Sequence, residues 1–361
     1  MLLEIKKFAA KMPGLRYVRI QRDVIRDNKH RGKTIQEKIE IARKKGIQSK
    51  NGLPRQIAFE VISRCILDCE FCILRDIKSW KYRRKSRMSF EEFKKIIDDI
   101  SYFTTDIQFS GGEPLINNDI FRMFDYARQN CISTLLATNA NLLIYRDNIQ
   151  KVIDHPPDEI LISYETLEEE TYKEIRKKGD FDALNEGIKK LVALKRDTKS
   201  FYPIITLQMV LTKKNMKYES EYWETVKKLG ADRASIKALG VWPEGDPSYD
   251  KKMAEEYIVT RSMHPISRHE IDEDGNIVFF RKPGECPGIQ HAYIGSGGEL
   301  IPCWYIIAKT EVMGNVIDQN FVDIWNSEKY KNYRYKMLND WANPLCHRCI
   351  GAASTSHKKD F

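Results

Sequence analysis

The stretch CILDCEFC (residues 65–72) decides the fold and carries the first functional signal. It follows the apolar run IAFEVI (residues 57–62), which predicts a strand that ends where the cysteines begin. Parallel α/β folds place functional groups at the carboxyl ends of their strands, so we expect the thiols there. An iron–sulfur cluster normally takes four thiolates, and this loop supplies three, Cys65, Cys69 and Cys72. The spacing indicates a cluster with one iron left free, or half of a zinc site.

A second motif follows one strand–helix unit later. The run DIQFS (residues 106–110) predicts a strand that leads directly into Gly111, Gly112, Glu113 and Pro114. Adjacent glycines allow the backbone to approach a ligand closely, and the carboxylate beside them can accept hydrogen bonds from an ammonium group. A lone GGEP would equally fit a tight turn between a strand and a helix. Because it follows the cysteine motif, two separate local signals agree.

Together the two motifs resemble the radical S-adenosylmethionine (radical SAM) superfamily, and the aromatic Phe71 before the third cysteine fits as well. The resemblance implies that the three cysteines hold a 4Fe–4S cluster and that SAM occupies the free iron. It also implies that the GGE segment (residues 111–113) binds the amino group of the cofactor's methionine part. SAM and a 4Fe–4S cluster are therefore the expected cofactors.

Two further stretches fit the same superfamily. ATNANLL (residues 137–143) looks like the end of its third strand, although Ala140 stands where a glycine is usual. ILISYE (residues 160–165) looks like its fourth strand. Glu165 departs from the usual aspartate, and it fits a helix-capping or solvated carboxylate as well as a role in the pocket. By the resemblance, two residues would hold the cofactor's carboxylate, Ser163 and Arg176, the latter through a two-pronged hydrogen bond.

Four more cysteines lie beyond the predicted barrel, at Cys286, Cys303, Cys346 and Cys349. The sequence around them, including GGELIPC (residues 297–303), resembles the SPASM group of auxiliary-cluster extensions. No cysteine follows Cys349 in this chain, which makes it look like the shortened "twitch" form with one auxiliary 4Fe–4S cluster. A structural zinc site with four cysteine ligands is the alternative, because thiolates suit both metals.

Apolar strands and periodic helices alternate after the cysteine loop. Residues 90–100 predict a helix with Ser89 as its N-cap. The expected strands end near Ser110, Thr138, Ser163, Val210 and Lys237. The alternation predicts an α/β fold, and the resemblance makes it a partial (β/α)6 parallel barrel with a small C-terminal cysteine-rich extension. We expect a basic N-terminal arm (1–52), the radical SAM partial barrel (53–245) and a twitch/SPASM-like auxiliary iron–sulfur domain (246–361).

Composition limits the function classes. The chain has 361 residues, of which 42% are hydrophobic and 31% charged, as in soluble globular proteins. No apolar run approaches the roughly 20 residues that span a bilayer, and no signal-peptide pattern is present. We therefore expect no membrane partner. Eight cysteines without an export signal indicate a reducing cytoplasm and thiols kept for metal.

Charge is concentrated near the N-terminus, where residues 1–50 carry 15 Lys and Arg against 5 Asp and Glu. We favour a solvated helix face for these charges over contact with nucleic acid, because few aromatic residues accompany them. A second basic run, in residues 78–87, follows the cysteine loop. There it would dock an acidic flavodoxin or ferredoxin as the electron donor, since opposite charges raise the encounter rate.

The resemblance implies an enzyme that cleaves SAM reductively to a 5′-deoxyadenosyl radical, which then abstracts a hydrogen from the substrate. We first expect oxidation or epimerisation of a small polar molecule, such as a carbohydrate or aminocyclitol, with help from the auxiliary cluster. The alternative is a maturase that modifies a ribosomal peptide or protein, and RNA modification is less favoured. The candidate substrate-contacting residues are Tyr164, Glu165, Gln208 and Trp304.

Overall fold

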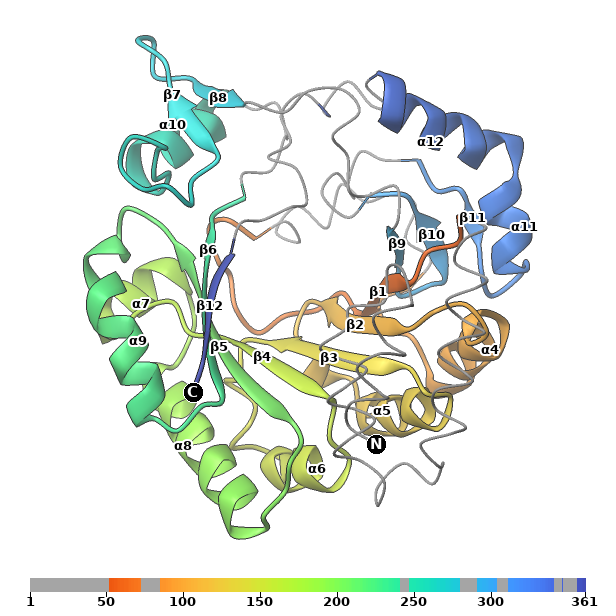
Figure 1. Cartoon of the computed structure of the whole chain (residues 1–361), viewed down its shortest axis with the longest axis horizontal. Coiled ribbons are helices and arrows are strands. Elements are labelled where there is room, and N and C mark those ends of the chain that lie inside the picture. Colours follow the sequence, from red (N-terminus) through yellow and green to blue (C-terminus); the bar gives the residue numbers. More distant parts are fainter. Residues whose placement is uncertain are drawn as a thin grey trace, which may run out of the picture.

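The computed structural model describes residues 52–72, 85–240, 247–279, 291–303, 311–340, 346 and 356–361. These residues form a mixed α/β fold around a ten-stranded sheet, with strand order β11-β10-β9-β1-β2-β3-β4-β5-β6-β12 (Figure 1). The six central strands run parallel and follow one another in sequence: β1 (Gln56–Ile62), β2 (Asp106–Gly111), β3 (Ser133–Thr138), β4 (Glu159–Ser163), β5 (Ile204–Leu211) and β6 (Arg233–Ala238). The predicted α/β class and parallel sheet are confirmed, and the barrel is not closed.

Helices cover the outer face of the curved sheet (Figure 1). They are α4 (Phe90–Ile100), α5 (Ile120–Gln129), α6 (Asn148–Asp154), α7 (Glu169–Ile175), α8 (Phe181–Asp197) and α9 (Glu219–Lys228), with short 3₁₀ helices at Pro114–Ile116 and Met216–Tyr218. Helix α4 begins as predicted. The Ser89 side chain accepts a hydrogen bond from the backbone N–H of Glu92, and the Glu92 side chain accepts one from the backbone N–H of Ser89. This reciprocal capping satisfies donors that the first helical turn leaves free.

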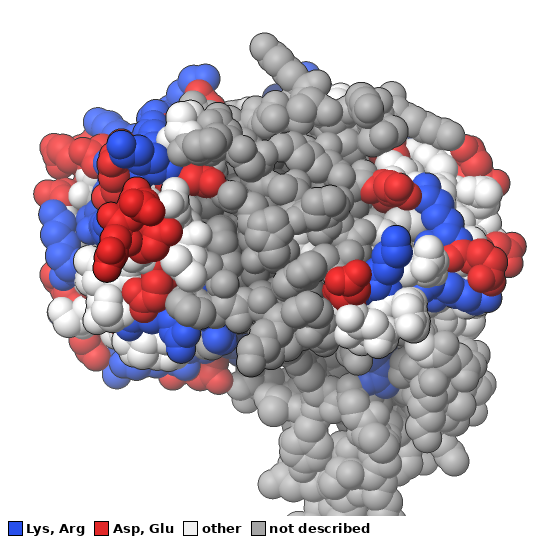
Figure 2. Space-filling view, turned by 90° about the horizontal axis from the view of Figure 1, so that it is seen from above, with Lys and Arg blue, Asp and Glu red and all other residues white. Residues whose placement is uncertain are grey.

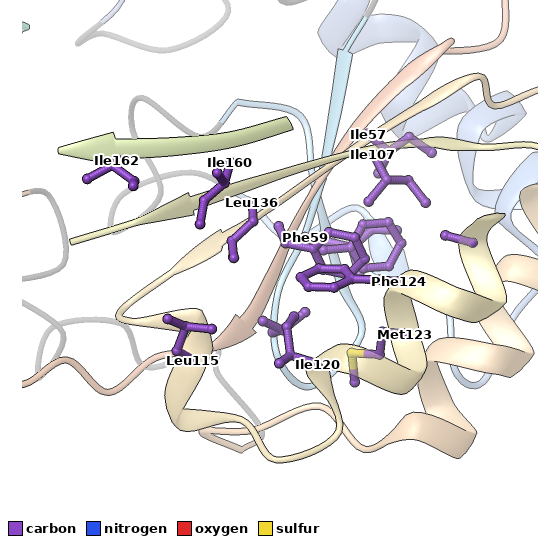
Figure 3. Close-up of a cluster of buried hydrophobic side chains, with 14 of the residues drawn as sticks. Ile57, Phe59, Ile107, Leu115, Ile120, Met123, Phe124, Leu136, Ile160 and Ile162 are labelled. Atoms are coloured by element: carbon purple, nitrogen blue, oxygen red, sulfur yellow. The ribbon is translucent and has the colours of Figure 1, made fainter. Parts of the chain in front are cut away.

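A cluster of aromatic and branched side chains fills the space between the sheet and the helices (Figure 3). Phe59 of β1 stands at its centre, with its ring centroid 5.4 Å from that of Phe93 in α4. The rings of Phe109 in β2 and Phe124 in α5 are 5.0 Å apart in an edge-to-face arrangement. Burial of each such ring contributes about 1.5–3 kcal/mol. Apolar residues therefore take the helix-facing positions of each strand, and the alternate positions lie on the opposite, inner face.

The C-terminal third of the chain extends the same sheet at both edges. Strand β9 (His291–Ile294) lies parallel to β1, and β10 (Glu299–Ile301) and β11 (Gly314–Asn315) follow it in antiparallel pairing. At the far edge β12 (Ser356–Asp360) pairs antiparallel with β6. Strands from the region that the sequence assigned to the auxiliary domain thus extend the central parallel sheet.

The remaining elements pack around this sheet. Helices α11 (Phe321–Asn326) and α12 (Glu328–Asn339) follow β11, and the Trp325 side chain of α11 donates a hydrogen bond to the carbonyl of Gly52 at 3.1 Å. Helix α10 (Pro247–Glu256) and the two-stranded sheet of β7 (His269–Ile271) and β8 (Ile277–Phe279) form a lobe that packs against the ends of β5 and β6 (Figure 1). Within the described residues, no helix combines the length and apolar character that membrane crossing requires.

Surface charge is mixed where the structure describes it. In Figure 2, Lys and Arg lie among Asp and Glu on the described surface at both sides of the view. Residues 1–51 of the predicted basic arm and residues 78–84 of the second basic run lie outside the described residues. The docking of an acidic electron donor therefore stays a prediction.

Candidate active site

The three cysteines lie on the loop that leaves the carboxyl end of β1. Backbone hydrogen bonds hold this loop in place, from Ser63 N–H to the Ser86 carbonyl and from Asp68 N–H to the Lys177 carbonyl, both at 2.9 Å. Cys69 is buried, Cys72 is half-buried and Cys65 is exposed. The loop is therefore tied to the backbone beyond α7 while one of its thiols stays open to the outside.

Each of two cysteine sulfurs accepts a hydrogen bond from a distant side chain. The Asn139 Nδ2 donates to Cys65 Sγ at 3.6 Å, and the Arg176 Nη1 donates to Cys69 Sγ at 3.5 Å. The backbone N–H of Leu67 adds a further bond to Cys65 Sγ at 3.4 Å. Donors of this kind stabilise thiolate ligands and tune the metal that they hold.

The electrostatics of the loop also fit a metal cluster. Although Cys65 is exposed as a residue, the protein around its sulfur excludes enough water to raise the pKa of the thiol to about 12, and negative charge on Glu113, Cys69 and Cys72 adds to the rise. Thiolates in this loop therefore need a cation to stabilise them. No three His, Cys, Asp or Glu side chains of the described part come together around a single ion.

The glycine pair of the GGE segment packs against the start of the cysteine loop. A Cβ on Gly112 would lie 2.0 Å from the carbonyl oxygen of Arg64, and one on Gly111 would lie 2.3 Å from that of Ile62. Gly111 also has a φ of +114°, which L side chains rarely adopt. Both glycines are thus needed for close approach, as expected. The atoms that they approach, however, are backbone atoms at the end of β1 and the start of the cysteine loop. Binding of the cofactor's amino group stays a prediction.

Glu113 is fully buried and connects β2 to the loop after β3. Its carboxylate accepts hydrogen bonds from Thr138 Oγ1 at 2.7 Å and from the backbone N–H groups of Asn139 and Leu115 at 2.8 and 3.1 Å. Burial raises the pKa of Glu113 and these bonds oppose the rise. Next to them Ala140 has a left-handed φ of +62°, which explains why glycine is usual there.

Glu165 is neither solvated nor a helix cap. It is fully buried, and α7 has Glu168 as its N-cap. The Glu165 carboxylate forms an ion pair with Arg176 and accepts a hydrogen bond from the backbone N–H of Val210 at 2.6 Å. The solvated and helix-capping interpretations were therefore wrong, and Glu165 acts within the same buried group as Arg176.

Arg176 connects this pair to the cysteine loop. Its guanidinium contacts Glu165 and Cys69 Sγ and lies 5.5 Å from the ring centroid of Phe71. Its buried Nε has no hydrogen-bond partner among the described residues. A buried donor without an acceptor is costly, so the group fits an added anion such as the expected cofactor carboxylate.

The other candidates divide between the two faces of the sheet. Ser163 and Gln208 are paired in register on the inner face, and both are half-buried. Tyr164 instead lies in the core, where its hydroxyl donates to Asn185 of α8 at 3.1 Å. Burial raises the pKa of Tyr164 to about 12. Trp304 lies outside the described residues.

Sequence reasoning did not single out Lys237, a charged residue that the structure places on the inner face. It lies on β6 opposite Val210, and its neighbours Ile236 and Ala238 belong to the core beneath the helices. The lysine therefore lies on the inner face with Ser163 and Gln208. The available signal was a single lysine inside the short run ASIKAL (residues 234–239).

The predicted auxiliary ligands are only partly described. Cys303 follows β10 and is half-buried, and Cys346 is buried. Cys286 and Cys349 lie outside the described residues. The ligand set of the auxiliary site, and its choice between a cluster and zinc, stay predictions on these residues.

Comparison with known proteins identifies both parts of the chain. Residues 59–208 match the radical SAM superfamily, and residues 286–350 match the iron–sulfur cluster-binding domain called SPASM. The chain carries a radical SAM domain followed by a SPASM domain. It is a radical SAM enzyme. The radical SAM domain implies SAM and a 4Fe–4S cluster as cofactors, and the SPASM domain implies auxiliary iron–sulfur clusters. The number of auxiliary clusters stays a prediction.

Curated relatives match most of the chain at low identity. The tungsten-containing aldehyde ferredoxin oxidoreductase cofactor-modifying protein of Pyrococcus furiosus is 26% identical over 82% of this chain and 87% of its own length. The AdoMet-dependent heme synthase of Methanosarcina barkeri is 24% identical over 78% and 85%. The PqqA peptide cyclase of Bradyrhizobium diazoefficiens is 23% identical over 82% and 79%.

Solved structures share the fold. SuiB of Streptococcus suis, bound to the precursor peptide SuiA, aligns with a TM-score of 0.57 and 16% identity over 84% of this chain and 72% of that one. The enzyme anSMEcpe, with bound AdoMet and a peptide, aligns with a TM-score of 0.51 and 14% identity over 83% and 91%. At these identities the likeness establishes the fold alone.

Proposed function

We propose that this radical SAM enzyme modifies a peptide or protein substrate. The relatives that cover most of the chain include a peptide cyclase and a cofactor-modifying protein, and this range favours the maturase alternative over a carbohydrate or aminocyclitol. Nothing in the described residues favours RNA. The observation that carries the proposal is the inner face of the parallel sheet, which presents the half-buried polar side chains of Ser163 and Gln208, while Arg176 contacts the cysteine loop.

The described residues suggest how this face works. When bound and reduced at the cluster, SAM supplies a radical that abstracts hydrogen from carbon. Glu165 fixes Arg176, which donates to the Cys69 sulfur and keeps Nε available for the cofactor's carboxylate, with Ser163 as its expected partner. Glu113 holds the loop after β3, so that Asn139 reaches the Cys65 sulfur. The sheet thus orients the cofactor, and the substrate is expected beyond it on the inner face.

The cofactor assignment is tested by anaerobic reconstitution and iron analysis. We expect about eight irons in the wild type and about four in a variant with Cys65, Cys69 and Cys72 changed to alanine. Only the wild type should produce 5′-deoxyadenosine under reduction. Zinc in the variant would make the C-terminal site structural.

The substrate class is tested by isotope transfer. Reconstituted enzyme and unlabelled SAM are incubated with size fractions of a fully deuterated cell extract, and the 5′-deoxyadenosine is analysed by mass spectrometry. We expect deuterium in the nucleoside only with the peptide and protein fraction. Deuterium from the small-molecule fraction alone would refute the maturase proposal and restore the carbohydrate hypothesis. The triple cysteine variant serves as the control.

A further inference from the structure

One charged side chain on the inner face has no role in the arrangement described so far. Lys237 is half-buried on β6, and no hydrogen bond or ion pair reaches its Nζ from the described residues. Buried lysines are almost always paired, because removing an ammonium group from water is costly. Burial accordingly lowers the pKa of Lys237.

The register of the sheet gives Lys237 polar neighbours. Gln208 pairs with Ser163 on one side and with Ser235 on the other, and its Nε2 donates to Ser235 Oγ at 3.3 Å. Lys237 lies two residues beyond Ser235 on the same face of β6. A polar row of Ser163, Gln208, Ser235 and Lys237 therefore crosses β4, β5 and β6. On β3 the half-buried inner residues are Ser133 at the start of the strand and the apolar Leu135 and Ala137 toward its end.

The negative charge that acts on Lys237 is already bonded to other groups. Glu165 attracts the ammonium group, whereas Arg176 and Lys358 of β12 repel it. The Glu165 carboxylate is already bonded to Arg176 and to the Val210 N–H. The carboxylate that attracts Lys237 is therefore already engaged by other donors. An anion placed on the inner face would supply the partner that the described residues do not give to the Lys237 ammonium group.

We propose that Lys237 contacts the substrate and binds a carboxylate group on it. The proposal rests on the proposed function in one respect, that the substrate reacts at the inner face of the sheet. Arg176 Nε and Ser163 are the expected partners of the cofactor's own carboxylate. The Lys237 amine is therefore left to bind a second anion. In a peptide this carboxylate belongs either to an acidic side chain or to the chain terminus.

Calorimetric titration of the reconstituted, SAM-loaded enzyme tests this site without turnover. The probes are N-acetylglutamate amide for a side-chain carboxylate, N-acetylalanine for a terminal one and N-acetylglutamine amide as the neutral control. We expect saturable binding of one carboxylate probe and none of the neutral probe. Lys237→Met should weaken that binding about tenfold to a hundredfold, and Lys237→Arg should retain it.

Two further measurements separate this role from others. SAM affinity should be the same in the wild type and in Lys237→Met, and the Met variant should melt no lower, because it removes an unpartnered buried charge. The proposal is overturned if neither carboxylate probe binds the wild type, or if the Met variant binds it equally well. It is also overturned if SAM affinity falls, which would assign the amine to the cofactor, or if the melting temperature drops, which would make Lys237 a structural partner of Glu165.

Discussion

Replacement of Glu165 by glutamine should destabilise the protein because it leaves a buried guanidinium without its counter-ion. Glu165 is fully buried and the Arg176 side chain is 14% exposed, so water can replace little of the lost interaction. Glutamine can still accept the hydrogen bond from the Val210 N–H, and the change therefore removes charge rather than shape. Loss of one partner of a buried pair costs about 3–5 kcal/mol. We expect the lower end, since Arg176 keeps its contact with the Cys69 sulfur.

Urea unfolding followed by circular dichroism measures this cost. The assay is run on cluster-free protein, so that metal binding does not contribute to the free energy of unfolding. Arg176→Gln and the double variant complete a double-mutant cycle, and we expect the double variant to lose much less than the sum of the two single changes. Glu186→Gln is the matched control, because Glu186 forms an exposed pair with Lys190 on α8.

Two results would refute this reasoning. A Glu165→Gln variant within about 1 kcal/mol of the wild type would mean that water or another group already compensates Arg176. Strictly additive losses in the cycle would mean that the two side chains do not interact. Unchanged cluster loading in a stable variant would further show that Arg176 does not need Glu165 to support the Cys69 ligand.

Three other predictions follow from the described contacts. Gly112→Ala should displace the cysteine loop, because its Cβ would lie 2.0 Å from the Arg64 carbonyl oxygen, and iron analysis should show loss of the first cluster. Gly275→Ala is the control, because it strains the turn between β7 and β8, where φ is +82° and nothing lies within 4 Å, and should retain the cluster. His269 has a pKa lowered by burial to about 4, so the unfolded state binds more protons and stability should fall by roughly 3 kcal/mol as pH drops from about 6.5 to 4. This loss should be absent from His269→Asn in urea unfolding at both pH values. Ser89→Ala should cost about 1 kcal/mol by the same assay through loss of the α4 cap.

Local signals in the sequence predicted the central fold well. Three predicted strand ends lie within one residue of the observed ones, at Ser110, Val210 and Lys237, and two others coincide with them, at Thr138 and Ser163. Hydrophobic alternation and capping are local properties, so a sequence displays them directly. The cysteine and GGE motifs are also contiguous stretches of sequence, so they could be recognised without knowledge of the fold.

Pairing between distant segments was not predictable in this way. Strand β9 joins β1 across more than two hundred residues of chain, and β12 is the polar segment SHKKD, which carries no apolar alternation. The burial of Glu165 depends on Arg176 and Val210, which lie on other elements. The isolation of Lys237 likewise depends on what its neighbours already bind. Such properties emerge only when the strands are side by side.

The pairing of both sheet edges with C-terminal strands has a consequence for synthesis of the chain on the ribosome. When β1 to β6 have emerged, β1 and β6 still present unpaired backbone N–H and C=O groups, because their partners β9 and β12 are not yet made. Open edges of this kind invite pairing with other chains, and long-range pairing is slow. We therefore expect nascent or truncated chains that end before β9 to aggregate, and chaperone binding to matter most over the final third of translation.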